Sequence, residues 1–239
     1  MHLVSKRYLA AAALALALSG NCAAGTFSVT PVRIYMNTKD RAVAVTITND
    51  GNEPVALQAE LFTWNQTADG ADELQLTDDL ILSPPIIKLA PNAKQVVRLA
   101  RAKAVQIDRQ LTYRMVMRQV PEALQRQENI QVPIALALSM PVFITPPAAR
   151  AKMACQGERV EGDLLRVRCT NSGNAYTQVR QMVLRQGDRT FGRFEGGEYI
   201  LPGAKKTLTI KTESALPPRL ELVVTYDDGR SEVFQLTVA

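Results

Sequence analysis

Histidine is almost absent from this sequence, because the one histidine among its 239 residues is His2. We expect that end of the chain to be removed, for the reasons given next. A mature chain without histidine excludes His-dependent catalytic triads and His-ligated metal sites. The chain also has no Gly-rich phosphate loop, and its acidic pairs, Asp78–Asp79 and Asp227–Asp228, stand in turn-like segments. We therefore expect no enzyme activity, no cofactor and no metal.

Long apolar runs are also lacking, except for one near the start. Tyr8–Leu18 is apolar, follows the basic pair Lys6–Arg7 and precedes several small residues. We expect residues 1–25 to be a secretory signal peptide. Cys22 allows an alternative, a lipoprotein lipidated at that residue, but Asn21 is a poor residue for a lipobox. No later segment reaches about 18 consecutive apolar residues, so we expect a soluble mature protein that does not insert into a membrane.

The excess of charge of one sign is small, and aromatic residues are few. Lys and Arg number 28 against 23 Asp and Glu, and the excess falls to three once Lys6 and Arg7 leave with the signal peptide. No block of Lys or Arg occurs, which argues against nucleic-acid binding. Aromatic residues make up only 5% of the chain. This argues against a carbohydrate-binding β-sandwich, which usually exposes several aromatic side chains on one face.

Cysteine is scarce as well, since only Cys155 and Cys169 remain beyond the signal peptide. In an exported protein such a pair indicates a disulfide, and no histidine is available to activate a catalytic thiol. Closing a loop of about 15 residues stabilises a fold by roughly 3 kcal/mol in the chain-entropy model. We expect a structural disulfide between these two residues.

Short β-rich segments between Pro, Gly, Asn and Asp clusters make up most of the chain. Val43, Val45 and Ile47 alternate with other residues and stop at Asn49–Asn52, as in a half-buried strand that ends in a turn. Pro146–Pro147 interrupts the pattern, and a second set of strands follows. Two such halves are typical of an all-β fold with two immunoglobulin-like β-sandwich domains. The other expected strands are Val55–Trp64, Gln95–Ala100, Leu111–Val120, Leu164–Thr170, Thr177–Leu184, Lys206–Ile210, Leu220–Tyr226 and Ser231–Val238.

Five stretches carry a family resemblance through their order and spacing. They are Val29–Tyr35, Ser83–Pro91 leading into Gln95–Arg98, Tyr113–Pro121, Cys169–Asn174 and Tyr199–Gly203. Together they resemble the pilus (fimbrial) periplasmic chaperone family of the chaperone-usher pathway. The divergent segments between them indicate an archaic or otherwise divergent branch.

This resemblance implies both an architecture and a function. It implies an N-terminal immunoglobulin-like domain at residues 26–146 and a C-terminal one at 147–239, set at an angle with a cleft between them. It also implies a periplasmic chaperone that binds pilin subunits by donor-strand complementation and delivers them to an outer-membrane usher.

The expected donor strand is the apolar run that precedes Pro146. Its large side chains, Val132, Ile134, Leu136 and Leu138, fall on one face of a strand. The alternative is an ordinary strand whose large residues fill their own core. Both faces of this strand are apolar, however, and Pro133 indicates an edge position. Such an edge invites pairing with another chain, either a subunit or a second copy of the free protein.

The resemblance also implies a basic anchor for the C-terminal carboxylate of the subunit. Arg33 stands at the matching position, and a guanidinium can pair with a carboxylate in a bidentate, charge-assisted way. The family usually has a second basic residue before the interdomain linker, but residues 139–145 contain no Lys or Arg. Arg114 and Arg118 on the neighbouring expected strand are candidates to replace it, as is Arg101, although each also fits a plain surface arginine.

Two other classes of protein remain as alternatives, with a carboxylate-dependent hydrolase as a more distant third. A secreted carbohydrate-binding β-sandwich or adhesin fits the export signal and the fold, but not the low aromatic content. A pilin would lack its last strand and carry an N-terminal extension for donation. This chain instead has two full sets of strands with the donor-like segment between them.

Overall fold

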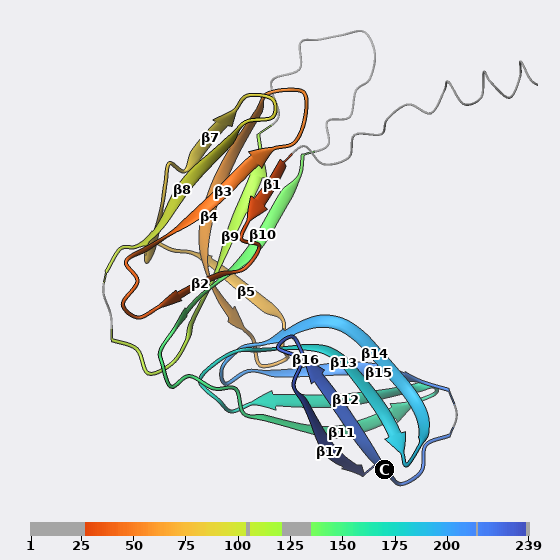
Figure 1. Ribbon diagram of the computed structural model, residues 1–239. Coiled ribbons are helices and arrows are strands. Elements are labelled where there is room, and N and C mark those ends of the chain that lie inside the picture. The colour runs from red at the N-terminus through yellow and green to blue at the C-terminus, as the bar shows by residue number, and fades with distance from the viewer. Residues whose placement is uncertain (1–26, 104–105, 121–134, 214, 238–239) are drawn as a thin grey trace, which may run out of the picture.

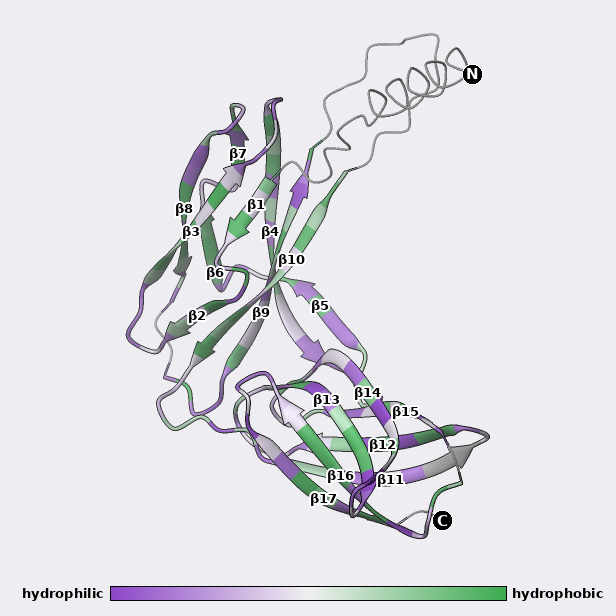
Figure 2. Ribbon diagram, turned by 45° about the vertical axis from the view of Figure 1, so that its right-hand side comes forward, coloured by the Kyte–Doolittle hydropathy of each residue, from purple (hydrophilic) through white to green (hydrophobic). Residues whose placement is uncertain are grey.

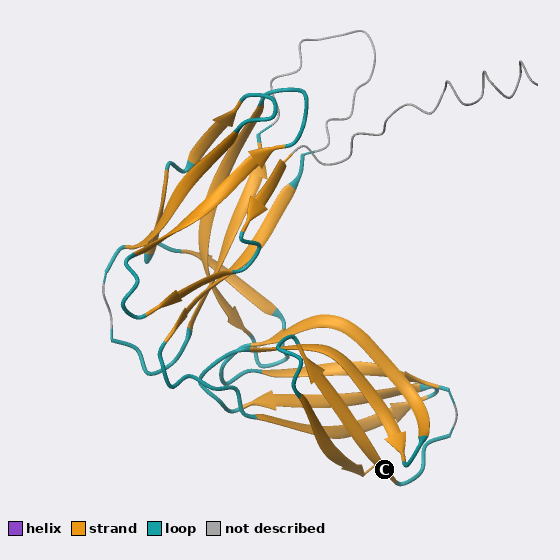
Figure 3. Ribbon diagram, viewed as in Figure 1, coloured by secondary structure: helices purple, strands orange, loops and turns teal. Residues whose placement is uncertain are grey.

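The computed structural model describes residues 27–103, 106–120, 135–213 and 215–237, so the expected signal peptide lies outside the described residues. The secondary structure in these ranges consists of β-strands alone, arranged in two β-sandwiches set at an angle (Figures 1 and 3). Within the same ranges, no helix is long and apolar enough to cross a membrane. The predicted all-β class is thereby confirmed.

The first sandwich has two sheets. One has the strand order β1-β3-β8-β6, and the other has the order β2-β10-β9-β4-β5 with β7 paired to β4. The pair between β2 and β10 is parallel, and the other pairs are antiparallel. The strands are β1 (Phe27–Thr30), β2 (Ile34–Asn37), β3 (Ala42–Asn49), β4 (Val55–Gln66), β5 (Asp72–Leu76), β6 (Leu80–Ser83), β7 (Ile86–Leu89), β8 (Lys94–Arg101), β9 (Leu111–Gln119) and β10 (Ala137–Thr145).

The second sandwich is one seven-stranded sheet, of order β11-β12-β15-β14-β13-β16-β17, folded over on itself. The fold lies at β14, which pairs with β13 along most of its length but with β15 only at Gly192 and Arg193. The two end strands of the sheet, β11 and β17, contact each other. The strands are β11 (Met153–Glu161), β12 (Leu164–Asn171), β13 (Thr177–Gln186), β14 (Arg189–Ile200), β15 (Lys205–Thr212), β16 (Arg219–Tyr226) and β17 (Ser231–Thr237).

Every second side chain along the strands points into the core of the first sandwich. Val45 and Ile47 on β3 are fully buried, and Val43 packs partly against the same cluster, as the pattern predicted. On β9, Met115 and Met117 are fully buried between the two sheets. Strand β5 was not predicted, and all five of its residues are exposed. Figure 2 accordingly colours β5 largely hydrophilic, whereas β10 is largely hydrophobic.

The five-residue sequence Thr-Asn-x-Gly-Asn occurs once in each sandwich, beginning at Thr48 and Thr170. The buried amides of Asn49 and Asn171 each donate to backbone carbonyls of neighbouring loops, and each side-chain oxygen accepts the amide of the glycine two residues on. A Cβ on Gly173 would lie 2.2 Å from a linker carbonyl oxygen, so no larger residue fits there. The same turn therefore closes β3 in one sandwich and β12 in the other.

The predicted disulfide joins Cys155 on β11 to Cys169 on β12. The two residues face each other as Cα partners in this antiparallel pair, and both are buried in the core of the second sandwich. This pairing confirms the structural disulfide.

A strand hairpin and a short linker connect the two sandwiches. The linker contains Pro146–Pro147 and lies between β10 and β11; the domain boundary placed there stays a prediction. The β4–β5 hairpin reaches the second sandwich, where the amide of Gln66 donates to the carbonyl of Tyr199 at 2.9 Å and its oxygen accepts the amide of Leu201 at 3.0 Å. The orientation of the second sandwich is thus tied to the sheet that contains β10.

Candidate functional site

Strand β10 has a free edge along the first half of its length. Antiparallel pairing with β9 covers Ala137–Ile144, but parallel pairing with β2 covers only Val142–Thr145. Within the part of the chain that the structure describes, residues 137–141 therefore have a strand neighbour on one side only. An open edge of this kind is a template on which another chain can add a strand.

The direction of the backbone groups on this edge follows from one hydrogen bond. The amide of Gln119 on β9 donates to the carbonyl of Leu136 at 2.8 Å. Because pairing groups alternate along an antiparallel strand, the backbone groups of Ala137, Ser139 and Pro141 point away from β9. Proline has no N–H to offer, and the parallel pairing of Val142 with Ile34 engages the Pro141 carbonyl. The free edge therefore provides two outward donors and two outward carbonyls, all from Ala137 and Ser139.

The four predicted donor residues are only partly within the described chain. Val132 and Ile134 lie outside the described residues. Leu136 and Leu138 are partly buried and pack against the core of their own sandwich. For these two leucines the packing matches the alternative of an ordinary core-filling strand, although part of each side chain is still accessible. Their role as donors stays a prediction.

An aromatic cluster, here called the junction cluster, fills the contact between the sandwiches. It consists of Trp64, Phe143, Tyr176, Tyr199 and Leu201. The rings of Phe143 and Tyr176 stack at 3.9 Å between centroids, and the edge of one ring meets the face of the other in the pair Trp64 and Tyr199, at 5.1 Å. The indole N–H of Trp64 is buried and has no hydrogen-bond partner among the described residues. The cluster is therefore an apolar contact that retains one unsatisfied donor.

Arg33 lies just before β2 and reaches across to the second sandwich. Its Nη1 is 2.5 Å from a carboxylate oxygen of Asp227, and its Nη2 donates to the side-chain oxygen of Gln178 at 2.6 Å. The guanidinium carbon lies 5.8 Å from the ring centroid of Tyr199. The predicted anchor is thus at the junction, but its guanidinium already has partners there.

Arg114 on β9 meets the same junction cluster with fewer partners. Its guanidinium lies 3.7 Å above the ring of Trp64 and 5.5 Å from that of Tyr199. The nearest carboxylate oxygen belongs to Asp72, at 3.8 Å, beyond hydrogen-bond distance. Among the described residues Arg114 makes no hydrogen bond, although its side chain is only 15% exposed. A guanidinium with free donors beside an unsatisfied indole N–H is suited to receive a carboxylate.

The other two candidate arginines lie elsewhere. Arg118 is four residues further along β9, about 13 Å at the usual rise per residue, and pairs with Glu60 at 3.2 Å on the exposed face. Arg101 ends β8 in the other sheet of the first sandwich, where it donates to the carbonyl of Thr38. The structure therefore brings Arg33 and Arg114 together around Tyr199, and neither Arg118 nor Arg101.

Burial alters the ionisation of these groups in different directions. Burial by itself lowers the pKa of Arg33, but its interactions with Tyr35 and Asp227 hold that pKa above the usual value. Burial lowers the pKa of Arg114, because the nearby Asp72 compensates the desolvation only in part. Burial also raises the pKa of Tyr176, with a further contribution from its hydrogen bond to Tyr35. The junction therefore presents two cations and neutral phenols to an incoming group.

A hollow of about 500 Å³ also lies between the sandwiches. Its walls include Asp79 and Tyr113 from the first sandwich and Leu201–Ala204 from the second. Within the described ranges, no group of three or more His, Cys, Asp or Glu side chains is placed to hold a metal ion. The chemistry that the junction offers is anion binding by arginine, beside an open strand edge.

The second half of the chain contributes residues to this site that no sequence pattern indicates. Gln178 and Tyr176 come from β13 and the turn before it, Tyr199 from β14, and Asp227 from the turn between β16 and β17. Asp227 lies in a turn, as its sequence predicts, but its carboxylate contacts Arg33 194 residues away. No local pattern in the sequence signals such a contact.

Comparisons with known proteins agree with this architecture. The family model for the pili and flagellar-assembly chaperone PapD N-terminal domain matches residues 26–150. Chaperone protein PapD of Escherichia coli is 27% identical over 154 residues, which cover 63% of this chain and 60% of PapD. The aligned part of the chain thus spans less than two thirds of that relative's length.

Solved structures share the fold across most of the chain. The archaic chaperone-usher complex of CsuC with the tip subunit CsuE, from Acinetobacter baumannii, matches with a TM-score of 0.67 and 18% identity, over 90% of this chain and 100% of that one. The SafB chaperone in complex with the SafA pilin of Salmonella enterica matches with a TM-score of 0.56 and 16% identity, over 88% and 95%. At these identities the likeness concerns the fold, two immunoglobulin-like sandwiches.

Proposed function

The chain belongs to the family of pili and flagellar-assembly chaperones, and we propose that it binds pilus subunits in the periplasm by donor-strand complementation and delivers them to an outer-membrane usher. A pilus subunit that lacks one strand of its own sandwich exposes an apolar groove with unpaired backbone groups. In this proposal the chaperone closes the groove with β10 and the residues before it. The protein acts by binding and not as an enzyme.

The observation that carries the proposal is the open edge of β10 at residues 137–141. Two outward N–H groups and two outward carbonyls, from Ala137 and Ser139, can continue a ladder into a second chain. Each backbone hydrogen bond contributes about 0.5–1.5 kcal/mol net. The edge therefore defines register and direction more than it supplies affinity.

The larger share of the affinity comes from apolar side chains in this proposal. Fully burying a residue such as valine or leucine stabilises a complex by about 1.5–3 kcal/mol. Leu136 and Leu138 already bury part of their surface against their own core, so each contributes less than this range. Val132 and Ile134 are the other two proposed donors.

Arg33 and Arg114 are the proposed anchors for the C-terminal carboxylate of the subunit. Both guanidinium groups lie within 6 Å of the Tyr199 ring, so one carboxylate bound over this ring could be reached by either. Among the described residues Arg114 makes no hydrogen bond, so its N–H groups can bind a carboxylate directly. Arg33 must first give up its contact with Asp227 or Gln178. Arg118 has no such position and is not an anchor in this proposal.

The proposed edge can be tested with Ser139→Pro. At this position proline removes an outward N–H, leaves the pairing with β9 intact, and repeats the geometry already present at Pro141. We expect unchanged thermal unfolding of the free protein and at least about tenfold weaker capture of a pilus subunit, from one lost hydrogen bond and the bulk of the ring. The subunit is chosen as the one from the same genome that elutes as a one-to-one complex with the wild-type chain.

Ser139→Ala is the matched control, because it keeps the outward N–H and should bind as the wild type does. Subunit affinity is measured by calorimetry on refolded subunit. Undiminished capture by Ser139→Pro would show that the subunit does not pair with this edge.

A further inference from the structure

The guanidinium of Arg33 is held by two acceptors from the second sandwich. Asp227 in the turn between β16 and β17 supplies a carboxylate oxygen at 2.5 Å, and Gln178 on β13 supplies an amide oxygen at 2.6 Å. The side chains of Arg33 and Asp227 are only 28% and 15% exposed. Among the described residues, this is the only ion pair that joins the two sandwiches.

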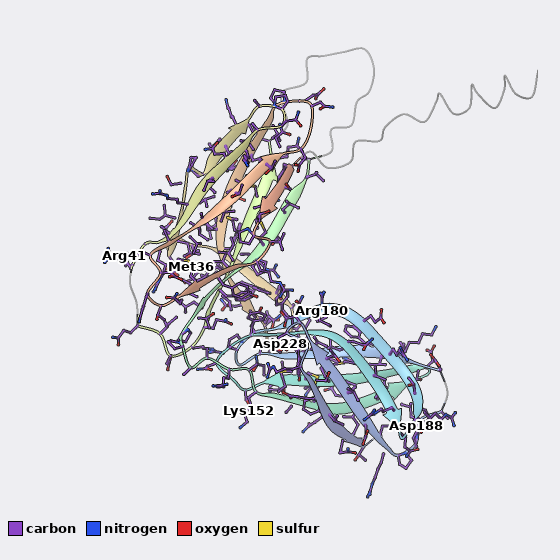
Figure 4. All side chains as sticks on the ribbon, in the orientation of Figure 1. Met36, Arg41, Lys152, Arg180, Asp188 and Asp228 are labelled. Carbon is purple, nitrogen blue, oxygen red and sulfur yellow. A yellow bond between two sulfur atoms is a disulfide. The ribbon has the colours of Figure 1, made fainter. Side chains whose placement is uncertain are left out.

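The acceptors are fixed in place before any ligand arrives. The amide of Asp227 donates to the carbonyl of Gln178 at 3.1 Å, so the two residues are joined through the backbone. The side-chain N–H₂ of Gln178 donates to the carbonyl of Gly197 at 2.7 Å, which leaves its oxygen facing Arg33. Figure 4 shows that Asp228, the next residue of the turn, lies at the end of the second sandwich that faces the first.

The surroundings of Asp227 match those that a bound carboxylate would need. Its oxygen lies beside the guanidinium and 3.5 Å from the hydroxyl of Tyr176, which is itself hydrogen-bonded to that of Tyr35 at 2.6 Å. A cation and a hydroxyl donor that converge on one carboxylate oxygen form a typical carboxylate site. In this structure the carboxylate comes from the chain itself.

We infer that Asp227 is an internal competitor for the anchor: it occupies Arg33 in the free protein and must be displaced before the terminal carboxylate of a subunit can bind there. The inference rests on the proposed function, since it concerns how strongly that same site binds. A ligand that needs a minor state of the protein binds more weakly in proportion to the population of that state. Asp227 therefore lowers the affinity of Arg33 for carboxylates, and capture at Arg33 releases the charged link between the sandwiches.

The test compares carboxylate binding in the mature wild-type protein with that in Asp227→Asn. Sodium acetate is the probe, titrated against sodium chloride at constant ionic strength, and the side-chain Nε–H signal of Arg33 is followed by NMR. We expect Asp227→Asn to bind acetate at least about tenfold more tightly, equivalent to about 1.4 kcal/mol. Asp227→Glu keeps a carboxylate within reach and should resemble the wild type.

Asp228→Asn is the matched control. Asp228 neighbours Asp227, but its carboxylate pairs with Arg230 inside the same turn, so its loss should leave acetate binding at Arg33 unchanged. Equal acetate affinity in wild type and Asp227→Asn would overturn the inference, as would the absence of acetate binding in both. A fold check by circular dichroism precedes each titration, and Asp227→Ser replaces Asp227→Asn if that variant does not fold.

A parallel titration with the pilus subunit separates this inference from the proposed function. If acetate binds more tightly to Asp227→Asn but no subunit binds to either protein, the competitor exists and the chaperone function fails. If the subunit binds both proteins equally and acetate does so too, the function holds and the competitor does not exist.

Discussion

Replacing Arg114 by methionine should separate subunit binding from stability at the junction. The side chain is largely buried, burial lowers its pKa, and the carboxylate of Asp72 approaches only to 3.8 Å. A poorly compensated buried cation costs several kcal/mol of desolvation, against about 0.5–2 kcal/mol gained from its position over Trp64. Methionine keeps the apolar length of the side chain. We expect the free energy of unfolding to fall by no more than about 1 kcal/mol, or to rise.

The same substitution should weaken capture of the subunit much more than it changes the stability of the free protein. A hydrogen bond between charged groups contributes about 1.5–3 kcal/mol. Losing one at Arg114 therefore weakens binding about 10- to 150-fold. The two effects differ in size because the free protein carries the cost of burying this cation, whereas the complex gains from it.

The assay uses urea unfolding and calorimetric titration with the subunit. Trp64 is the only tryptophan of the chain, so its fluorescence reports unfolding at the junction itself. Arg118→Met is the control, because that arginine lies on the same strand, is 55% exposed and pairs with Glu60; it should change neither quantity. Wild-type affinity in Arg114→Met would refute the anchor. A loss of about 3 kcal/mol in stability would instead show that the cation is well compensated in the free protein.

Two further predictions concern the framework of the site. Asn171→Ala should lower the free energy of unfolding of the second sandwich by about 2–4 kcal/mol, because buried backbone carbonyls lose their donor. Asn49→Ala should have the same effect in the first sandwich. A free energy from urea unfolding within about 1 kcal/mol of the wild-type value would contradict the role of both amides. Gln66→Leu should widen the range of angles between the sandwiches with little effect on their stability, since it removes the hydrogen bonds to Tyr199 and Leu201; an unchanged maximum dimension in small-angle scattering would contradict this.

The strand pattern was largely readable from the sequence because half-buried strands repeat with a period of two. Val45 and Ile47 are buried as expected, and the disulfide joins the expected cysteines. Strand β5 could not be predicted, because its five residues are all exposed and it exists through its pairing with β4. Strand β14 could not be predicted either, because it contains Gly192, Gly196 and Gly197, and glycine normally weakens a strand.

The site was predictable only on its first-sandwich side. Arg33 and Arg114 were singled out, but their surroundings depend on how the second sandwich docks. The contacts of Arg33 with Gln178 and Asp227 span 145 and 194 residues of sequence, and no periodicity links residues so far apart. Whether an arginine at the junction has free donors is a property of tertiary structure, and it distinguishes Arg114 from Arg33 in a way that residue type cannot.

Pro141 marks the end of the free edge of β10 and so limits how far an incoming strand can pair with it. The edge runs from residue 137 to 141, four steps or about 13 Å at the usual rise. Beyond it β2 occupies the edge, and at Pro141 itself a rung of the ladder is missing. Arg114 is the Cα partner of Pro141 on the adjacent strand, so the proposed carboxylate site lies level with this stop. A chain whose last carboxylate binds there can extend only back towards Ala137, and it must therefore run parallel to β10.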